Sequence, residues 1–230
     1  MKVNVLCLYY DIMNLYGDTG NVKVLEYHLK EQGIDYNIDY KSIDDKIVFS
    51  DYNIVFIGAS NEENRFICLD HLIKYKKDIK KYVEDGGYFL ATGNSVSMFG
   101  KSLYERDAVG LFSYDVCESK ERISKEVILE NNICSSIYGF VNHQDIVNNL
   151  DSDMYLFDGE GIHYKNFFGT FVLGPILSRN PEFLEYFFKG FVSSIDDKFK
   201  FKDMNVALNK KAYDEFIEFK KTKVFNSHNA

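Results

Sequence analysis

The segment from Gly86 to Gly100, GGYFLATGNSVSMFG, has the residue spacing best suited to chemistry. A short apolar run, a corner of small residues and a second apolar segment are typical of a strand, a tight turn and a helix. In α/β hydrolases this nucleophile elbow holds one reactive side chain above the carboxyl edge of a sheet. Here the residue at the apex is Gly93, which has no side chain. The segment therefore predicts an elbow that has no nucleophile.

A shift of two residues would give the elbow a serine. The sequence GNSVS, which starts at Gly93, nearly matches the motif G-x-S-x-G and would put Ser95 at the apex. The residues that could act as its base, or orient that base, are His143, His163, Asp145, Asp158 and Glu160. The shift breaks the spacing to Gly100 and puts Ser95 in the first turn of the helix. We therefore interpret Ser95 as a helix residue and His143 as a structural residue on a loop, with a serine hydrolase as the alternative.

The elements that must position this corner alternate between strands and helices. Apolar runs predict four strands, at 3–9, 36–43, 53–57 and 88–91. A first helix follows Asp18, a plausible N-cap, and ends before Gly33, and a second, long helix covers 62–84. This β-α-β order predicts a mostly parallel sheet with helices on both faces and any site at the carboxyl ends of the strands.

The pattern changes in the second half of the chain. Short, partly alternating strands at 111–117, 126–129 and 136–141 predict an antiparallel extension on one edge of the sheet. Further elements are a turn at 159–161, a strand at 167–173, a helix that begins at Pro181 after Asn180, and a last helix at 209–221. We expect one α/β domain over residues 1–200, followed by a C-terminal helix and polar tail over 201–230.

Composition excludes several classes of function. The net charge of −8 argues against binding to nucleic acid, because a phosphate backbone selects basic surfaces. The four cysteines have no paired metal-ligand spacing, so we expect packing thiols in a reducing cytoplasm and no metal or cofactor. We see no signal peptide and no apolar run long enough for membrane insertion, and we expect a cytoplasmic protein.

Three stretches together resemble a known family. They are YYDIMNLYGDTGN (9–21), YGFVNHQ (138–144) and FFGTFVLGPILSRNPEFLEY (167–186). They are similar in order and spacing to the cobyrate-type (CobB/CobQ-like) class I glutamine amidotransferases, and within that family to the GatD-like glutaminase subunits of lipid II isoglutaminyl synthases. The resemblance implies a flavodoxin-like α/β fold. It also implies that the chain supplies ammonia from glutamine to a Mur-ligase-like (MurT-type) partner, which amidates the peptidoglycan precursor.

The resemblance also implies that two catalytic residues are missing. Glutamine hydrolysis needs a thiolate on the elbow, a histidine and backbone N–H groups that bind the oxyanion. If Gly100 matches the closing glycine of the family's elbow, Gly93 stands at the position of the cysteine. The family's histidine lies two residues before the proline of a Gly-Pro pair, and Leu173 stands at that position here. The glycine-rich oxyanion loop is reduced to Gly58-Ala59-Ser60, and the arginine expected just after the Asn-His motif is absent near Gln144.

We therefore expect a degenerate GatD-like subunit without glutaminase activity that partners a MurT-like Mur ligase in lipid II amidation. One alternative is an active amidotransferase, or a Ser95 hydrolase, with a rearranged site. Another is a free-standing module that binds a small molecule. The residues expected to remain at a binding surface are Tyr16, Gly17, Asp18, Gly58, Ala59, Ser60, Asn94 and Asn142.

Overall fold

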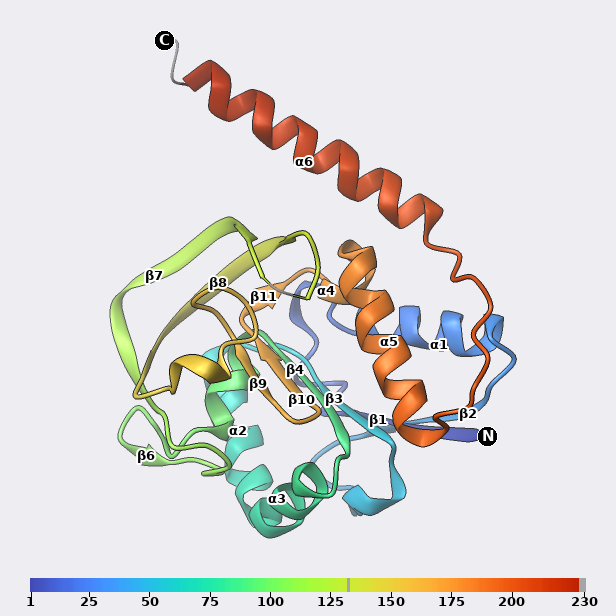
Figure 1. Cartoon of the computed structure of the whole chain (residues 1–230). Coiled ribbons are helices and arrows are strands. Elements are labelled where there is room, and N and C mark those ends of the chain that lie inside the picture. Colours follow the sequence, from blue (N-terminus) through green and yellow to red (C-terminus); the bar gives the residue numbers. More distant parts are fainter. Residues whose placement is uncertain (132, 228–230) are drawn as a thin grey trace.

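The computed structural model describes residues 1–131 and 133–227 and has a six-stranded central sheet in the order β2-β1-β3-β4-β10-β9 (Figure 1). Its strands are β1 Lys2–Leu8, β2 Asp35–Lys41, β3 Ile54–Ile57, β4 Tyr88–Thr92, β9 Ile162–Tyr164 and β10 Phe167–Thr170. All neighbouring pairs are parallel except β9 with β10. The predicted, mostly parallel sheet is confirmed, and β4 lies inside it between β3 and β10.

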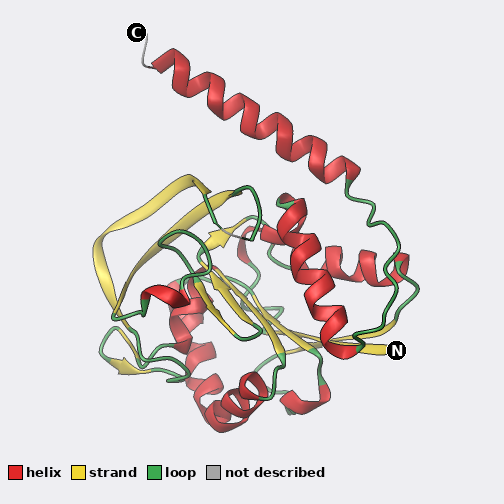
Figure 2. Cartoon of the chain, viewed as in Figure 1, coloured by secondary structure: helices red, strands yellow, loops and turns green. Residues whose placement is uncertain are grey.

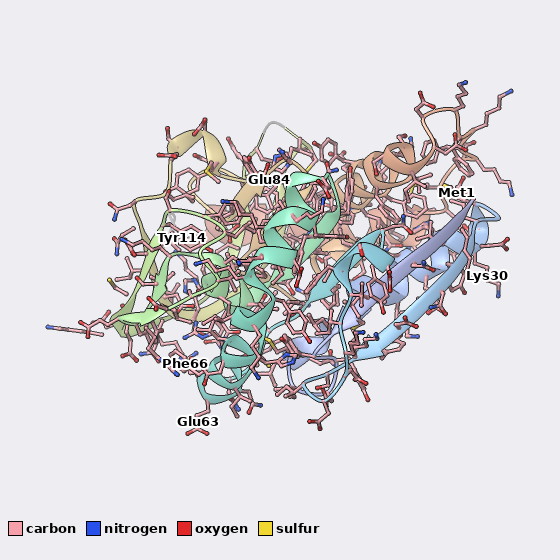
Figure 3. The ribbon with its side chains drawn as sticks, turned by 90° about the horizontal axis from the view of Figure 1, so that it is seen from below. Met1, Lys30, Glu63, Phe66, Glu84 and Tyr114 are labelled. Carbon is pink, nitrogen blue, oxygen red and sulfur yellow. The ribbon has the colours of Figure 1, made fainter. Side chains whose placement is uncertain are left out.

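Helices cover both faces of this sheet, because β4 presents apolar side chains to each face in turn. Successive strand residues point to opposite faces. Tyr88 contacts Phe187 of α5 (Pro181–Ile195) at 5.6 Å, measured between ring centroids, while Phe89 contacts Tyr82 of α3 (Lys76–Glu84) at 6.4 Å. Helix α1 (Gly20–Glu31) lies beside α5, and α2 (Glu62–Leu72) and α3 lie together over the other face, from Glu63 to Glu84 (Figure 3). Every residue of β3 and β4 is consequently buried.

Two predicted elements are interrupted. The long helix expected over 62–84 is broken by a 3-10 turn, Ile73–Tyr75, because the backbone of Tyr75 leaves the helical region (φ −101°, ψ 12°). This break packs the Tyr75 ring against His71 and Phe49. The strand expected over 167–173 is divided at Phe171 into β10 and β11 (Val172–Leu173). The chain thereby crosses from the central sheet to a second one.

The second sheet has the order β11-β8-β7-β5-β6. Its remaining strands are β5 Ser102–Leu103, β6 Arg106–Asp107, β7 Asp115–Leu129 and β8 Ile137–Asn148. Its long strands are the curved yellow ribbons beside the central sheet in Figure 2. The predicted extension is thus a separate sheet, antiparallel except where β5 pairs with β7. Only residues 115–117 of the strand expected at 111–117 are in a strand. They belong, with the strand expected at 126–129, to one long strand, β7, which has a register shift between Glu118 and Ile123.

The C-terminal part leaves the compact body. After α4 (Ile176–Arg179) and α5, the chain continues to α6 (Ala207–Ser227), which projects outward (Figure 1). The first half of α6 is anchored, since Phe216 stacks on Tyr138 with ring centroids 4.1 Å apart. With its bounds at Ala207 and Ser227, this last helix is longer than the predicted 209–221. Residues 228–230 of the expected polar tail lie outside the described residues.

Candidate functional site

The corner after β4 is built around Gly93. Its φ of 62° lies in the left-handed region that residues with a Cβ adopt at a cost. A Cβ on Gly93 would lie 2.5 Å from the Ala59 Cβ and 2.6 Å from the Leu173 Cδ2. A 3-10 turn, Gly93–Phe99, follows the corner and is completely buried. The predicted corner geometry is confirmed, and it leaves no room for a side chain at the apex.

Gly93 and Leu173 are neighbours, although 80 positions separate them in the sequence. Leu173 lies in β11, pairs with Phe140 of β8 and is only 1% exposed. The two positions that the resemblance assigned to the catalytic cysteine and histidine thus face each other. Here they form an apolar contact: glycine has no side chain and leucine has no ionisable group, so neither residue can attack an amide or move a proton.

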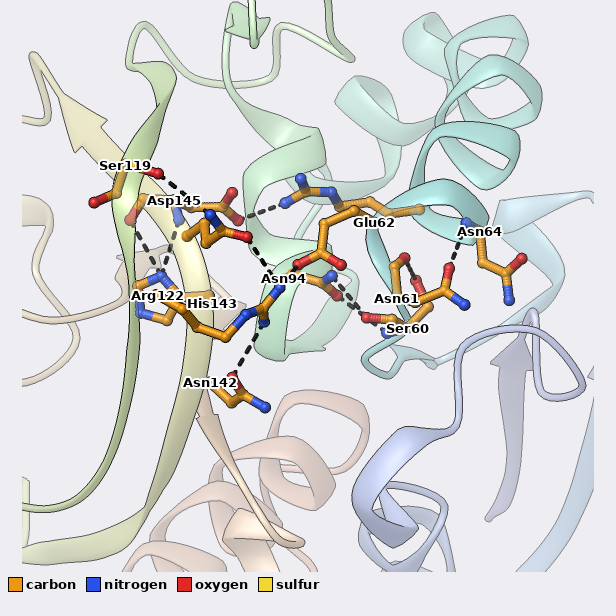
Figure 4. A network of polar contacts seen from close by, with 12 residues as sticks. Ser60, Asn61, Glu62, Asn64, Asn94, Ser119, Arg122, Asn142, His143 and Asp145 are labelled. Carbon is orange, nitrogen blue, oxygen red and sulfur yellow. Dashed lines mark hydrogen bonds and ion pairs between the residues drawn. The ribbon is translucent and has the colours of Figure 1, made fainter.

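The loop after β3 uses its own amides internally. The Ala59 N–H donates to the Asp18 Oδ2 over 2.8 Å, and the Ser60 N–H donates to the Asn94 Oδ1 over 3.0 Å. The Asn94 amide in turn donates to the Ser60 carbonyl over 2.7 Å (Figure 4). An oxyanion hole needs backbone N–H groups that are free to bind the developing charge. Both loop amides already have partners, so this loop cannot provide such donors without rearrangement.

Asp18 lies beneath this loop and does not cap α1, contrary to the prediction. Thr19 occupies the N-cap position, and the Asp18 Oδ2 accepts hydrogen bonds from the Ala59 N–H and from the Thr92 hydroxyl, the latter at 2.8 Å. Its Oδ1 has no hydrogen-bond partner among the described residues. Burial raises the pKa of the Asp18 carboxyl to about 6, more than the two hydrogen bonds lower it. The side chain ties the corner to the loop.

The outer part of the site is polar and exposed. Tyr16 is 47% exposed with a strained φ of 60°, and its hydroxyl accepts a hydrogen bond from the Asn142 amide over 2.6 Å. Arg122 of β7 donates to the Asn142 Oδ1 and the Gln144 Oε1, both at 3.1 Å, and to Glu62 at 2.5 Å (Figure 4). Arg122 was missed from the sequence because it lies among other charged residues of β7. The arginine beside Gln144 thus comes from the neighbouring strand.

The serine and histidine alternatives lie apart from one another. Ser95 is fully buried, and its hydroxyl donates to the Thr92 carbonyl over 2.7 Å and to the Ile57 carbonyl over 3.3 Å. His143 lies within strand β8, not on a loop as expected, and stacks on Phe171 with ring centroids 4.4 Å apart. No hydrogen bond joins Ser95 to a histidine in the described part of the chain. The geometry gives Ser95 the helix-turn role expected of it.

A buried ion pair that the sequence did not reveal is linked to the turn after Gly93. Arg65 of α2 contacts the Asp145 Oδ2 at 2.5 Å, and both side chains are almost completely buried. The same carboxylate accepts hydrogen bonds from the hydroxyl groups of Ser97 and Tyr104, each at 2.5 Å. Asp145 therefore links β8, α2 and the turn after Gly93. It does not orient a histidine for catalysis.

No group of three or more histidine, cysteine or acidic side chains suited to a metal ion occurs within residues 1–131 and 133–227. Within those same ranges no helix is both long enough and apolar enough to cross a membrane.

Known proteins are similar to this chain in sequence and in architecture. Residues 4–181 match the CobB/CobQ-like glutamine amidotransferase domain. The chain is 30% identical over 198 residues to the GatD subunit of the glutamine-hydrolysing lipid II isoglutaminyl synthase of Streptococcus pneumoniae, covering 78% of this chain and 76% of that subunit. It is 28% identical over 195 residues to the corresponding Staphylococcus aureus subunit, covering 76% and 79%.

Two solved structures share the fold at low sequence identity. PurLQS from Thermotoga maritima has a TM-score of 0.57 and 18% identity, and the match covers 85% of this chain and all of that chain. A glutamine amidotransferase from the same organism has a TM-score of 0.54 and 13% identity, with 92% of both chains covered. The match to residues 4–181, together with the corner after β4, assigns the chain to the CobB/CobQ-like glutamine amidotransferase family.

Proposed function

We propose that this chain is a non-hydrolysing, GatD-like subunit that partners a MurT-like Mur ligase in the amidation of the peptidoglycan precursor lipid II. The relatives at 28–30% identity are GatD subunits of lipid II isoglutaminyl synthases, which supports a role as a subunit of such an enzyme. The observation that carries the loss of hydrolysis is the contact between Gly93 and Leu173. By the resemblance, these are the two positions at which a thiol and an imidazole would have to meet, and the short distance between them supports the proposal.

The four cysteines of the chain do not replace the missing thiolate. A nucleophilic cysteine needs a lowered pKa and access to the substrate. Cys7 of β1 and Cys68 of α2 are buried, and burial raises the pKa of each thiol to about 12. Cys117 lies on β7, and Cys134 lies in the segment that joins β7 to β8. None of the four stands at the apex of the corner.

The loss of activity is tested by ammonia release from glutamine, measured for the purified chain alone and with its Mur-ligase-like partner. We expect no release above the buffer background, with an active class I glutaminase as the positive control. Glutamine turnover that Ser95→Ala abolishes would instead establish the serine alternative. Turnover that survives Ser95→Ala would show an active site that we have not identified.

The partner surface that we propose lies at the carboxyl edge of the central sheet, where α/β folds present their sites. It comprises Tyr16, Gly17 and Asn61, which are exposed, whereas Gly58, Ala59 and Ser60, which were also expected at this surface, are buried beneath it. Tyr16 is the proposed anchor, because an exposed, rigid aromatic ring contributes more to an interface than charges at its rim. Its strained backbone and its hydrogen bond to Asn142 hold the ring in place before any partner binds.

Co-purification with the proposed Mur-ligase-like partner tests this surface. We expect the wild type to form a complex that Tyr16→Ala weakens at least tenfold, because truncation removes a hot-spot ring worth about 2 kcal/mol. Tyr27→Ala is the matched control, since Tyr27 is 44% exposed but lies on α1. Failure of the wild type to bind would favour the free-standing binding module. A complex that tolerates Tyr16→Ala but is lost when the chain after Met204 is deleted would move the interface to α6.

A further inference from the structure

A cavity of about 330 Å³ lies between the β7–β8 hairpin and the turn that precedes β9. Its walls are formed by alternate residues of both strands, among them Val127 of β7 and Val141 and Val147 of β8, with Phe171 beside them. Successive strand residues point to opposite faces, so this is the other face of the hairpin from Asn142. The cavity is therefore separate from the contacts around Tyr16, and its volume falls at the lower end of the range of small-molecule sites.

The turn between Phe157 and Gly161 positions the carboxylate of Glu160 at this cavity. Phe157 and Glu160 exchange backbone hydrogen bonds of 2.9 and 3.2 Å. Gly161 follows with a φ of 74°, and a Cβ there would lie 2.5 Å from the Gly169 carbonyl oxygen. The Glu160 carboxylate accepts hydrogen bonds from the Phe171 N–H at 2.5 Å and from the Thr170 hydroxyl at 2.8 Å. The turn thus fixes Glu160 where the chain crosses between the two sheets.

Glu160 has no cation to balance its charge. Among the described residues it makes no ion pair, and removal from water raises the pKa of its carboxyl to about 7. Asp145, which also lines the cavity, is neutralised by Arg65. His143 supplies no charge at neutral pH, because burial lowers the pKa of its imidazole. The other charged groups of the lining, Lys125 and Asp158, are exposed to solvent and oppose each other in sign.

We propose that this cavity binds a small hydrophobic amine, whose ammonium group contacts Glu160 and whose apolar body packs against the valine walls. An ionised carboxylate taken out of water is stabilised by a cation that also hydrogen-bonds to it. An ammonium group supplies both the charge and the hydrogen bonds, while an anion would be repelled by the Glu160 carboxylate. This site goes beyond the proposed function and does not depend on the loss of glutaminase activity.

The test compares three probes of similar shape by isothermal titration calorimetry with the full chain. They are 3-methylbutylamine, which is cationic, 3-methylbutan-1-ol, which is neutral, and 4-methylpentanoate, which is anionic. We expect the amine to bind at least tenfold more tightly than the other two. Glu160→Gln should weaken amine binding at least tenfold, because glutamine keeps the shape and still accepts a hydrogen bond from Phe171 but carries no charge. Glu84→Gln is the matched control, as this surface carboxylate pairs with Lys165 far from the cavity lining.

Several results would overturn the proposal. They are equal binding of the amine and the alcohol, tighter binding of the acid, or no binding of the amine at millimolar concentration. Unchanged amine binding by Glu160→Gln would remove the carboxylate from the site. Val147→Phe, which fills the cavity without changing its charge, should abolish amine binding, and retained binding would refute the location. If Glu160→Gln fails to fold, Val147→Phe and the comparison of probes on the wild type still decide the question.

Discussion

Replacement of Gly93 by alanine tests the corner on which the proposed loss of hydrolysis depends. A side chain at a φ of 62° costs about 1 kcal/mol in backbone strain. The added Cβ would also lie 2.5 Å from the Ala59 Cβ and 2.6 Å from the Leu173 Cδ2. Such overpacking adds about 1–3 kcal/mol. We therefore expect Gly93→Ala to lower the free energy of unfolding by about 3 kcal/mol and the thermal midpoint by roughly 10 °C.

Gly17→Ala is the control that separates strain from overlap. Gly17 has a φ of 74°, but no atom lies within 4 Å of the position its Cβ would take. Gly17→Ala should therefore lower the free energy of unfolding only by the backbone strain, about 1 kcal/mol. Urea unfolding of both variants, and of Gly93→Ala combined with Leu173→Ala, gives the comparison. The double variant should be more stable than additivity predicts, because the truncated leucine no longer overlaps the new methyl group. Equal destabilisation by Gly93→Ala and Gly17→Ala would refute the proposed contact with Leu173.

Three further predictions concern parts of the chain outside the corner. The pKa of Asp18 is raised from 3.8 to about 6, so the folded state holds this proton more tightly than the unfolded state does. Stability should therefore fall by roughly 2 kcal/mol as pH rises from about 4 to about 6, and by roughly 3 kcal/mol over the whole range from below about 3 to above about 7. Asp18→Asn should flatten this slope in urea titrations at each pH, and an unchanged slope would assign it to other groups. Arg65→Met leaves Asp145 buried without a counter-charge and should cost about 3–5 kcal/mol, whereas a cost below 1 kcal/mol would mean that water compensates the carboxylate. Phe216→Ala removes the stack on Tyr138 and should speed proteolysis of α6 with little change in the thermal midpoint of the body, and unaltered proteolysis would contradict an anchoring role for this ring.

The central sheet and its corner could be predicted from the sequence because local signals determine them. Apolar runs such as Tyr88 to Ala91 fit only buried strands, and Gly93 marks the point where the backbone turns. Pro181 begins α5 as expected, because its fixed φ suits the first helical position. The same logic predicted that Gly93 follows β4 at a turn and that Gly58 to Ser60 follow β3.

The features that were missed depend on contacts between distant residues. Arg65 looks like any charged helix residue until Asp145, 80 positions later, is placed against it. Asp18 resembles a capping residue, but tertiary hydrogen bonds to Ala59 and Thr92 take its carboxylate instead. The sequence pattern predicts two strands where there is one, β7, because the segment from Glu118 to Glu126 is polar and mostly charged, with Ile123 as its one apolar residue, and so hides the continuity of the strand. No local pattern encodes these arrangements.

The packing of Gly93 against Leu173 also limits how this lineage can evolve. A cysteine at position 93 meets an occupied space, and a histidine at position 173 alone would put an imidazole into an apolar contact with no proton to transfer. The hydrogen bonds of Asp18 and Asn94 to the loop amides must also be released before an oxyanion could bind. Under the proposed loss of hydrolysis, each single step back would therefore cost stability and return no catalysis. On that proposal, descendants of this chain are expected to diversify in what they bind, since the path back to hydrolysis would require several simultaneous substitutions.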